Sequence, residues 1–149
     1  MRKKLKKLLS PKNVYLELSA DSKQGVIEEM IVRLANNGMI QNIEEALKTV
    51  MDREKKMSTG MTNGVAIPHG KTDSVNQLVV AVALKKKGVD FASADNMPAT
   101  IFIMTISPLS RSGPHIQFLA EVSKILKDAN SRQLLLEAAT VEDVVKVFS

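Results

Sequence analysis

The sequence has 149 residues, of which 44% are hydrophobic and 25% are charged, and this balance predicts a single globular domain with a substantial core. It contains no cysteine, which excludes disulfide bonds and thiolate metal ligands and makes a cytoplasmic location the expected one. No apolar run approaches the length of a membrane-spanning helix, and the basic N-terminus lacks the apolar segment and cleavage site of a signal peptide.

The net charge of +5 is concentrated at the N-terminus. Six of the 21 Lys and Arg residues precede residue 13, which leaves 15 basic against 16 acidic residues in the rest of the chain. We therefore expect a basic N-terminal arm over residues 1–12 and a near-neutral domain over residues 13–149. A nucleic-acid-binding protein should carry a basic face on its folded body, with aromatic side chains if it binds single strands. The body is near neutral and the chain has only four Phe and one Tyr, so we expect no nucleic-acid partner.

Two amphipathic helices are predicted in the first third of the chain, after a short apolar stretch over residues 14–18. The first is capped by Asp21 or Ser22 and ends at Asn37-Gly38. The second begins at Asn42, with Glu45 completing a possible capping box. Apolar residues recur at i, i+3, i+4, i+7 and i+8 in both: Ile27, Met30, Ile31, Leu34 and Ala35, then Ile43, Ala46, Leu47, Val50 and Met51.

The middle and end of the chain predict strands followed by helices. Residues 78–84 and 99–106 are short apolar runs rich in branched side chains, which suit strands buried on both faces. Gly113-Pro114 then begins a third helix, and two more helical segments follow over residues 132–139 and 141–148. Phe118, Val122, Ile125 and Leu126 form the core side of the third helix, and Thr140 with Asp143 can cap the last. Helices, strands and helices in this order predict a layered α/β/α domain.

The stretch GVAIPHGKT, from Gly64 to Thr72, ends like a nucleotide-binding loop. The loop motif GxxxxGK[ST] would need glycine at the position of Val65, one residue nearer to Gly70 than Gly64 lies. Pro68 also removes an amide donor and pushes the residue before it into an extended conformation. A strand is expected to follow where the motif needs a helix. These three features together exclude the nucleotide interpretation.

The same stretch instead predicts a strand that stops at Pro68 and leaves His69 exposed in a glycine-flanked bend. Imidazole is a good nucleophile and can hold a phosphoryl group through a transferable N–P bond. Gly70 leaves room for a partner to approach closely. On residue type alone, a surface loop with an incidental histidine remains the simpler interpretation.

Two other positions favour a phosphoryl site. The apolar stripe of the second helix continues by spacing to Glu54, next to Arg53, and a charge there either lies beyond the core or points to a site. His115 lies in the first turn of the Pro114 helix, where free amides and the helix dipole favour an anion. A nucleophile, a fixed cation and a second imidazole form the set that a transferring phosphoryl group requires.

The motif residues, in order, are Arg53-Glu54, Ser58-Thr59-Gly60, Gly64 to Gly70, Asp90-Phe91, Asp95-Asn96 with Pro98, and His115 to Leu119. Arg53 lies 16 residues before His69, and His115 lies 46 residues after it. Over Val14 to Phe148 the chain resembles the enzyme IIA domain, fructose-mannitol class (type 2), of the bacterial phosphoenolpyruvate-dependent sugar phosphotransferase system. The basic arm and the segment from Ser110 to Pro114 do not map onto the family pattern.

The resemblance implies a three-layer α/β/α sandwich with a central mixed β-sheet, and a phosphotransferase that needs no cofactor or metal. It implies that His69 is phosphorylated by the phosphorylated histidine-containing phosphocarrier protein. Arg53 would bind the phosphate, His115 would position the phosphoryl group, and Glu54 would have a supporting role. The implied acceptor is a cysteine on a separate IIB component, and any membrane contact would be peripheral, through the IIC transporter.

Two functions remain open at this point. The first is a phosphocarrier in sugar uptake, and the second is a nitrogen-related regulatory protein that controls partner proteins through its phosphorylation state. A metal site on His69 and His115 is a weaker alternative, because the two are far apart in sequence without a short-range ligand pair. The sequence does not name the sugar or the oligomeric state.

Overall fold

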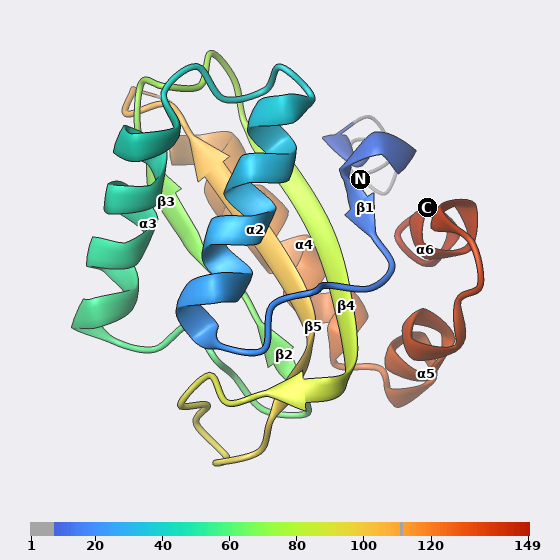
Figure 1. The fold of residues 1–149 in the computed structure, drawn as a ribbon. Coiled ribbons are helices and arrows are strands. Elements are labelled where there is room, and N and C mark those ends of the chain that lie inside the picture. Colours follow the sequence, from blue (N-terminus) through green and yellow to red (C-terminus); the bar gives the residue numbers. More distant parts are fainter. Residues whose placement is uncertain (1–7, 111) are drawn as a thin grey trace.

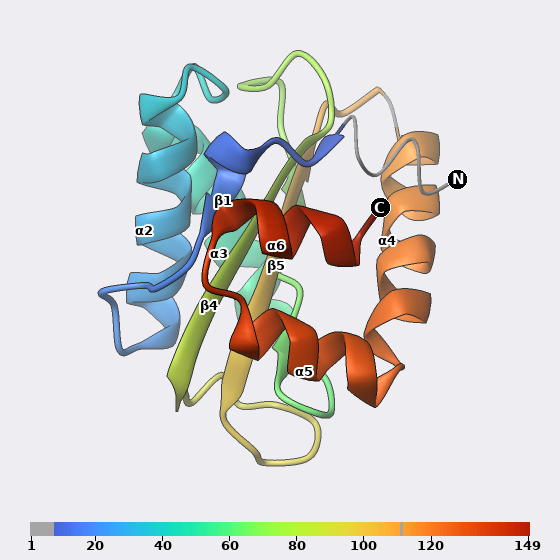
Figure 2. The ribbon, with the colours of Figure 1, turned by 90° about the vertical axis from the view of Figure 1, so that its right-hand side faces the viewer.

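A mixed β-sheet lies between two layers of helices (Figure 1, Figure 2). The computed structural model describes residues 8–110 and 112–149, so most of the expected basic arm lies outside the described residues. The helices α2 (Lys23–Asn36) and α3 (Ile43–Lys56) cover one face of the sheet. The other face is covered by α4 (Ser112–Leu126), α5 (Ala129–Glu137) and α6 (Val141–Val147). This arrangement is the predicted three-layer α/β/α sandwich.

The sheet has five strands in the order β1-β4-β5-β2, and β3 also pairs with β5. Its centre is the antiparallel pair of β4 (Val79–Val89) and β5 (Ala99–Ser107). On one side β1 (Val14–Tyr15) runs parallel to β4. On the other side β2 (Val65–Ala66) and β3 (His69–Lys71) run parallel to β5. Parallel and antiparallel pairs therefore coexist, and the sheet is mixed, as the resemblance implies.

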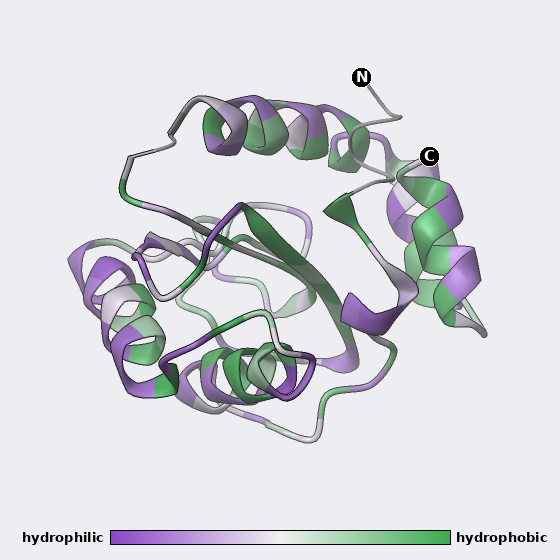
Figure 3. Ribbon diagram, turned by 90° about the horizontal axis from the view of Figure 1, so that it is seen from above, coloured by the Kyte–Doolittle hydropathy of each residue, from purple (hydrophilic) through white to green (hydrophobic). Residues whose placement is uncertain are grey.

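The two faces of the sheet hold two separate hydrophobic clusters, because side chains alternate along each strand. On β5, Phe102 and Met104 belong to the cluster under α2 and α3, whereas Ile101 and Ile103 belong to the cluster under α4, α5 and α6. Figure 3 shows a largely hydrophobic central strand between helices of mixed character. Burial on both faces explains why the two central strands appear in the sequence as unbroken apolar runs.

Side-chain caps begin three helices where the sequence places them. Ser22 accepts a hydrogen bond from the Gly25 amide at the start of α2. Asn42 accepts one from the Glu45 amide at the start of α3, which is half of the expected capping box. The full box forms at α6, between Thr140 and Asp143. The caps satisfy amides that a helix leaves unpaired in its first turn.

Several boundaries differ from the expected ones. Ile43 is 39% exposed instead of buried, because it is the first residue of α3 and lies beyond the packed part of the helix. The strand β4 continues past Leu84 to Val89, because its pairing with β5 resumes after an irregularity. The helix α5 begins at Ala129, earlier than predicted, because Asp128 caps it. Leu9, within the expected arm, is buried in the cluster under α4, α5 and α6. In the part of the chain that the structure describes, no helix has the length and apolar character needed to cross a membrane.

Candidate functional site

His69 lies inside the sheet and not in a bend after a strand end. The strands β2 and β3 flank Ile67-Pro68, and both pair with β5 in one register: Ala66 is opposite Phe102 and His69 is opposite Thr105, an offset of 36 residues in each case. Pro68 has no N–H to donate, but its carbonyl accepts a hydrogen bond from the Thr105 amide at 3.1 Å. The expected strand end at Pro68 is therefore a two-residue interruption. Because the strand resumes, His69 is half-buried instead of exposed.

Gly70 is the point where β3 meets α3. A Cβ atom added there would lie 2.9 Å from Cγ2 of Thr49 and 3.2 Å from Cγ2 of Val50. Since side chains alternate along a strand, His69 and Lys71 project from the opposite face, toward α4. The chain continues through Lys71 in β3, so no helix begins at the GKT ending. The helix start that a nucleotide-binding loop needs is therefore missing at this position.

The orientation of the His69 ring is fixed by its own backbone neighbour. Nδ1 lies 2.8 Å from the carbonyl oxygen of Ile67. A carbonyl oxygen can only accept, so Nδ1 carries a hydrogen and donates it. In the neutral ring this leaves Nε2 with the free lone pair. Nε2 is therefore the nitrogen of His69 that can act as a nucleophile.

The structure brings His69 and His115 together. Their ring centroids lie 5.7 Å apart with an interplanar angle of 76°, an edge-to-face arrangement. His115 lies in the first turn of α4, as the sequence predicts, and its residue surface is only 3% exposed. Two imidazoles from distant parts of the sequence thus form one cluster at the junction of β3, β5 and α4.

Both ring nitrogens of His115 have hydroxyl partners on β5. Thr105 Oγ1 lies 2.7 Å from Nε2, and Ser107 Oγ lies 3.2 Å from Nδ1. In a neutral ring one nitrogen donates and the other accepts, and a hydroxyl can serve either one. Burial lowers the pKa of His115 from 6.5 to about 4, and electrostatic interactions with His69 and Lys71 act in the same direction. His115 is therefore an uncharged, hydrogen-bonded ring at neutral pH.

Arg53 lies in the last turn of α3. Its Nη1 donates a hydrogen bond to the carbonyl of Met57 at 2.7 Å. The helix α3 runs in the direction opposite to β3 (Figure 1), so the turn beyond Val50 lies toward the His69 end of that strand. Among the described residues, no hydrogen bond joins Arg53 to either histidine. The guanidinium is bonded to the end of its own helix.

Glu54 is a buried anchor between two helices. It is 4% exposed, and its carboxylate accepts hydrogen bonds from the amide and the hydroxyl of Thr59, the former at 2.7 Å. Lys23, in the first turn of α2, places Nζ 2.7 Å from the same carboxylate. Glu54, the charged residue on the apolar stripe of α3, therefore neither lies beyond the core nor points to the histidines. It fixes the loop after α3 to the start of α2.

Thr105 and Ser107 are residues of the site that the sequence did not reveal. Both lie at the end of an apolar strand, two residues apart, on the same face as Ile101 and Ile103. Both are fully buried, and a buried polar side chain needs a hydrogen-bond partner. The signal in the sequence was a pair of hydroxyl residues two positions apart in a strand, a spacing that places both on the same face. Their partner His115 could not be identified without the register of the sheet.

The described residues contain no cluster of three or more His, Asp or Glu side chains that could hold a metal ion.

The fold is that of solved enzyme IIA structures at 24% sequence identity. Residues 7–149 match the family model described as phosphoenolpyruvate-dependent sugar phosphotransferase system, EIIA 2. The chain belongs to this family, whose general activity is phosphoryl transfer.

Three relatives illustrate the range of the family. The chain is 34% identical over 135 residues to the fructose-specific EIIA component of Haloferax volcanii, covering 89% of this chain and 88% of that protein. It is 30% identical over 146 residues to the fructose-specific EIIABC component of Bacillus subtilis, covering 98% of this chain but only 23% of that protein. It is 25% identical over 143 residues to a nitrogen regulatory protein of Bradyrhizobium diazoefficiens, covering 95% and 92%.

Two solved structures share the fold. The nitrogen regulatory protein IIA-Ntr of Neisseria meningitidis has a TM-score of 0.90 at 24% identity, covering 97% of this chain and 99% of that one. The enzyme IIA for mannitol of Escherichia coli, solved in complex with phosphorylated enzyme IIB, has a TM-score of 0.81 at 24% identity, covering 94% and 96%.

Proposed function

We propose that this chain is a phosphocarrier of sugar uptake. Nε2 of His69 accepts a phosphoryl group from the phosphorylated histidine-containing phosphocarrier protein and passes it to a cysteine of a IIB component. The observation that supports this most directly is the hydrogen bond from Nδ1 of His69 to the Ile67 carbonyl. It leaves Nε2 as the nucleophile and holds the ring beside His115.

The same hydrogen bond serves both halves of the transfer. In the first half, the lone pair of Nε2 attacks phosphorus while the N–P bond of the donor breaks, and the ring of His69 gains positive charge. A charged N–H donates a stronger hydrogen bond than a neutral one, so the Ile67 carbonyl stabilises the phosphorylated ring. In the second half, a cysteine thiolate attacks phosphorus and the electron pair of the N–P bond returns to Nε2.

His115 and Arg53 would bind the phosphoryl oxygens. Both ring nitrogens of His115 are already bonded, so one of them must exchange its Thr105 or Ser107 hydroxyl for a phosphoryl oxygen. Arg53 must likewise leave the Met57 carbonyl. A guanidinium can bind two phosphoryl oxygens at once, which a lysine cannot reproduce. Glu54 supports the site indirectly, by holding the loop that follows Arg53.

A separate IIB component is the natural acceptor. This sequence has no cysteine, so the acceptor thiol lies outside it. The mannitol IIA of Escherichia coli, which shares the fold, is known in complex with phosphorylated IIB. We place the transfer in the cytoplasm, with membrane contact only through a IIC transporter. The reaction needs neither a cofactor nor a metal, because phosphorus moves between side chains without nucleotide.

Intact-mass measurement tests the proposal. The chain is incubated with phosphoenolpyruvate, enzyme I and the phosphocarrier protein, and one added phosphoryl group is expected on the wild type. The His69→Ala variant should gain none, because its nucleophile is gone. Since His115 does not form the bond, His115→Ala is the matched control and should be labelled more slowly. A wild type without label, or a fully labelled His69→Ala variant, would overturn the assignment.

A regulatory role is the second candidate, and one observation favours it. The nitrogen regulatory protein of Bradyrhizobium diazoefficiens aligns with this chain over 92% of its own length. The labelled chain can be mixed with a purified fructose-type IIB component to decide between the two roles. Rapid loss of label to the IIB cysteine would favour transport. Retention of the label, with a change in affinity for another protein, would favour regulation.

A further inference from the structure

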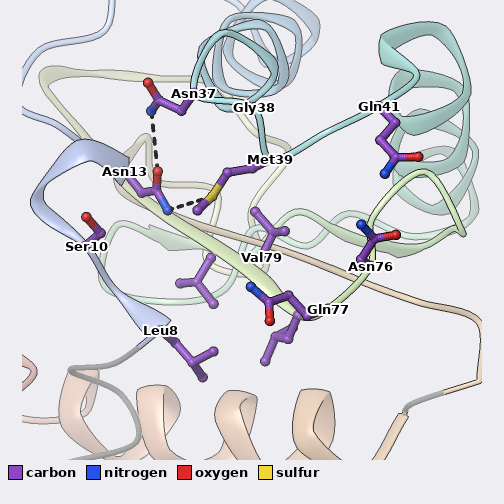
Figure 4. A pocket seen from close by; sticks show the side chains of 12 residues that line it. Leu8, Ser10, Asn13, Asn37, Gly38, Met39, Gln41, Asn76, Gln77 and Val79 are labelled. Carbon is purple, nitrogen blue, oxygen red and sulfur yellow. Dashed lines mark hydrogen bonds between the residues drawn. The ribbon is translucent and has the colours of Figure 1, made fainter.

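A pocket of about 450 Å³ lies at the start of β4, on the edge of that strand that does not pair with β5 (Figure 4). It is formed where the short 3-10 helix η1 (Pro11–Asn13), the end of α2 and the start of β4 meet. In the strand order, β5 separates β4 from β3, which carries His69. The described lining of the pocket contains neither histidine, although its residue Val80 pairs with Thr105, the hydroxyl partner of His115.

The pocket exists because the edge of β4 is only partly covered. Among the described residues, β1 pairs with β4 at Val82 and Ala83. The start of β4, at Val79 and Val80, lines the pocket instead of pairing with a strand on that edge. Leu8 and Val80, on one face of the sheet, provide an apolar surface at the pocket, whereas Val79 belongs to the hydrophobic cluster on the other face.

The polar side of the pocket is made of carboxamides. None of the described residues that line it is charged, and five of them are Asn or Gln. They come from segments that are far apart in the sequence: Asn13, Asn37, Gln41, Asn76 and Gln77. Each carboxamide presents a donor and an acceptor side by side.

Asn13 is the buried member of this set. It is fully buried, yet its Nδ2 donates to the thioether sulfur of Met39 at 3.2 Å, and its Oδ1 receives a long hydrogen bond of 3.4 Å from Asn37. A thioether is a weak acceptor. A buried amide with weak partners gains from a stronger acceptor, which a ligand in the pocket would supply.

Three of the carboxamides at the pocket are exposed. The side chains of Gln41, Asn76 and Gln77 form no hydrogen bond with other described residues. Figure 4 shows these side chains around the pocket, with Gln41 in the loop between α2 and α3 and with Asn76 and Gln77 in the loop before β4. The amide of Gln41 donates to the Ser74 carbonyl at 2.9 Å, so the backbone that carries these side chains is fixed before a ligand arrives.

We propose that this pocket binds a small neutral polyhydroxy compound, a sugar or a polyol. A hydroxyl group both donates and accepts, which complements a carboxamide, and several hydroxyls can satisfy carboxamides that approach from different sides. The apolar surface suits the C–H face of such a compound, and the volume falls in the range of small-molecule sites. A charged ligand is disfavoured, because no described lining residue would compensate its charge. The proposal does not rest on the phosphocarrier function.

The proposal is tested by titrating the full chain with D-glucose and, separately, with D-glucitol, and recording nitrogen-proton correlation spectra at each concentration. Saturable shifts are expected for the side-chain amides of Asn13, Gln41 and Gln77, and the two compounds distinguish a ring from an open chain. D-gluconate has the skeleton of D-glucitol with one carboxylate, and should bind about tenfold more weakly or worse. Saturation by neither neutral compound, equal binding of D-gluconate, or tighter binding of the primary amide succinamide would each overturn the proposal.

Variants connect the binding to the pocket. Gln77 is exposed, so Gln77→Ala should fold normally and raise the Kd of the better compound by about 2- to 10-fold, the effect of one hydrogen bond. Gln24→Ala removes an equally exposed carboxamide outside the pocket and should leave the Kd unchanged. Equal Kd values for the wild type and a Gln41→Ala, Gln77→Ala double variant would overturn the proposal.

Discussion

Glu54 is the buried carboxylate whose contacts hold the loop after α3. We expect Glu54→Gln to lower the free energy of unfolding by about 1–3 kcal/mol, because Lys23 loses its anion and a hydrogen bond of Thr59 is weakened. The range is below that of a fully buried pair, since the Lys23 side chain is 25% exposed. Urea unfolding measures the change. Glu28→Gln, on the exposed side of α2, is the matched control and should stay within about 0.5 kcal/mol of the wild type.

The same variant separates structural support from chemistry. The carboxylate bonds to Thr59 and Lys23, not to a histidine ring, so the folded Glu54→Gln variant should still accept one phosphoryl group on His69. A folded variant that no longer accepts the group would assign Glu54 a direct part in the transfer.

The residues of the site differ in how far the sequence could predict them. His69 and His115 were found because a family pattern and a helix start mark them, and the structure places their rings 5.7 Å apart. The hydroxyl partners Thr105 and Ser107 depend on strand register, which local patterns do not fix. Lys23 and Glu54 are 31 residues apart in sequence and lie on different helices, so their ion pair depends on how those helices pack.

The helices and central strands were predictable because local chemistry decides them. Caps at Ser22, Asn42 and Thr140 satisfy first-turn amides wherever the helix packs. The interruption between β2 and β3 was not predictable in the same way. Pro68 interrupts the strand pattern of the sequence, but the pairing with β5 continues in the same register beyond it. His69 therefore begins a new strand, β3.

The contact between β3 and α3 depends on the missing side chain of Gly70. Gly70→Ala should lower the free energy of unfolding by about 1–3 kcal/mol, because its Cβ would lie 2.9 Å from Thr49 Cγ2 and force the strand and helix apart. Removing that methyl group with Thr49→Ser should recover part of the loss in the double variant. Thermal or urea unfolding of the single and double variants gives the coupling between the two positions.

Gly113→Ala is the control for this contact. Among the described residues, no atom beyond the neighbouring residues and the backbone of the same helix lies within 4 Å of a Cβ added there, and the residue is in α4, where alanine is preferred over glycine. This variant should be as stable as the wild type or more stable. If Gly70→Ala were equally harmless, the close approach of α3 to β3 would be wrong.

The sheet carries its two polar sites on different strands. The histidine pair lies at β3 and β5, under the start of α4, and the carboxamide pocket lies at the free edge of β4. Both sites occur where a strand edge or end is left without a neighbour. The protonation of His115 also affects the stability of the whole domain, because burial lowers its affinity for a proton in the folded state.

We expect the free energy of unfolding to decrease as the pH falls from about 6.5 to about 4. The pKa of His115 is lowered from 6.5 to about 4 in the folded protein. Between these values the unfolded chain binds a proton that the folded chain does not, so acidification favours unfolding. The loss attributable to this one group is at most about 3 kcal/mol. Denaturant unfolding at a series of pH values measures it.

The His115→Gln variant isolates this contribution. Glutamine keeps a donor and an acceptor near Thr105 and Ser107 but does not titrate. Carboxylates with lowered pKa values, such as Asp95 and Asp143, become protonated at more acidic pH. The stability that this removes is the same in the wild type and in His115→Gln. The difference between the wild type and the variant should therefore change with pH only where His115 titrates. Parallel curves across this range would show that His115 is protonated in the folded state as readily as in the unfolded chain, and that the uncharged ring assigned to the phosphoryl site is wrong.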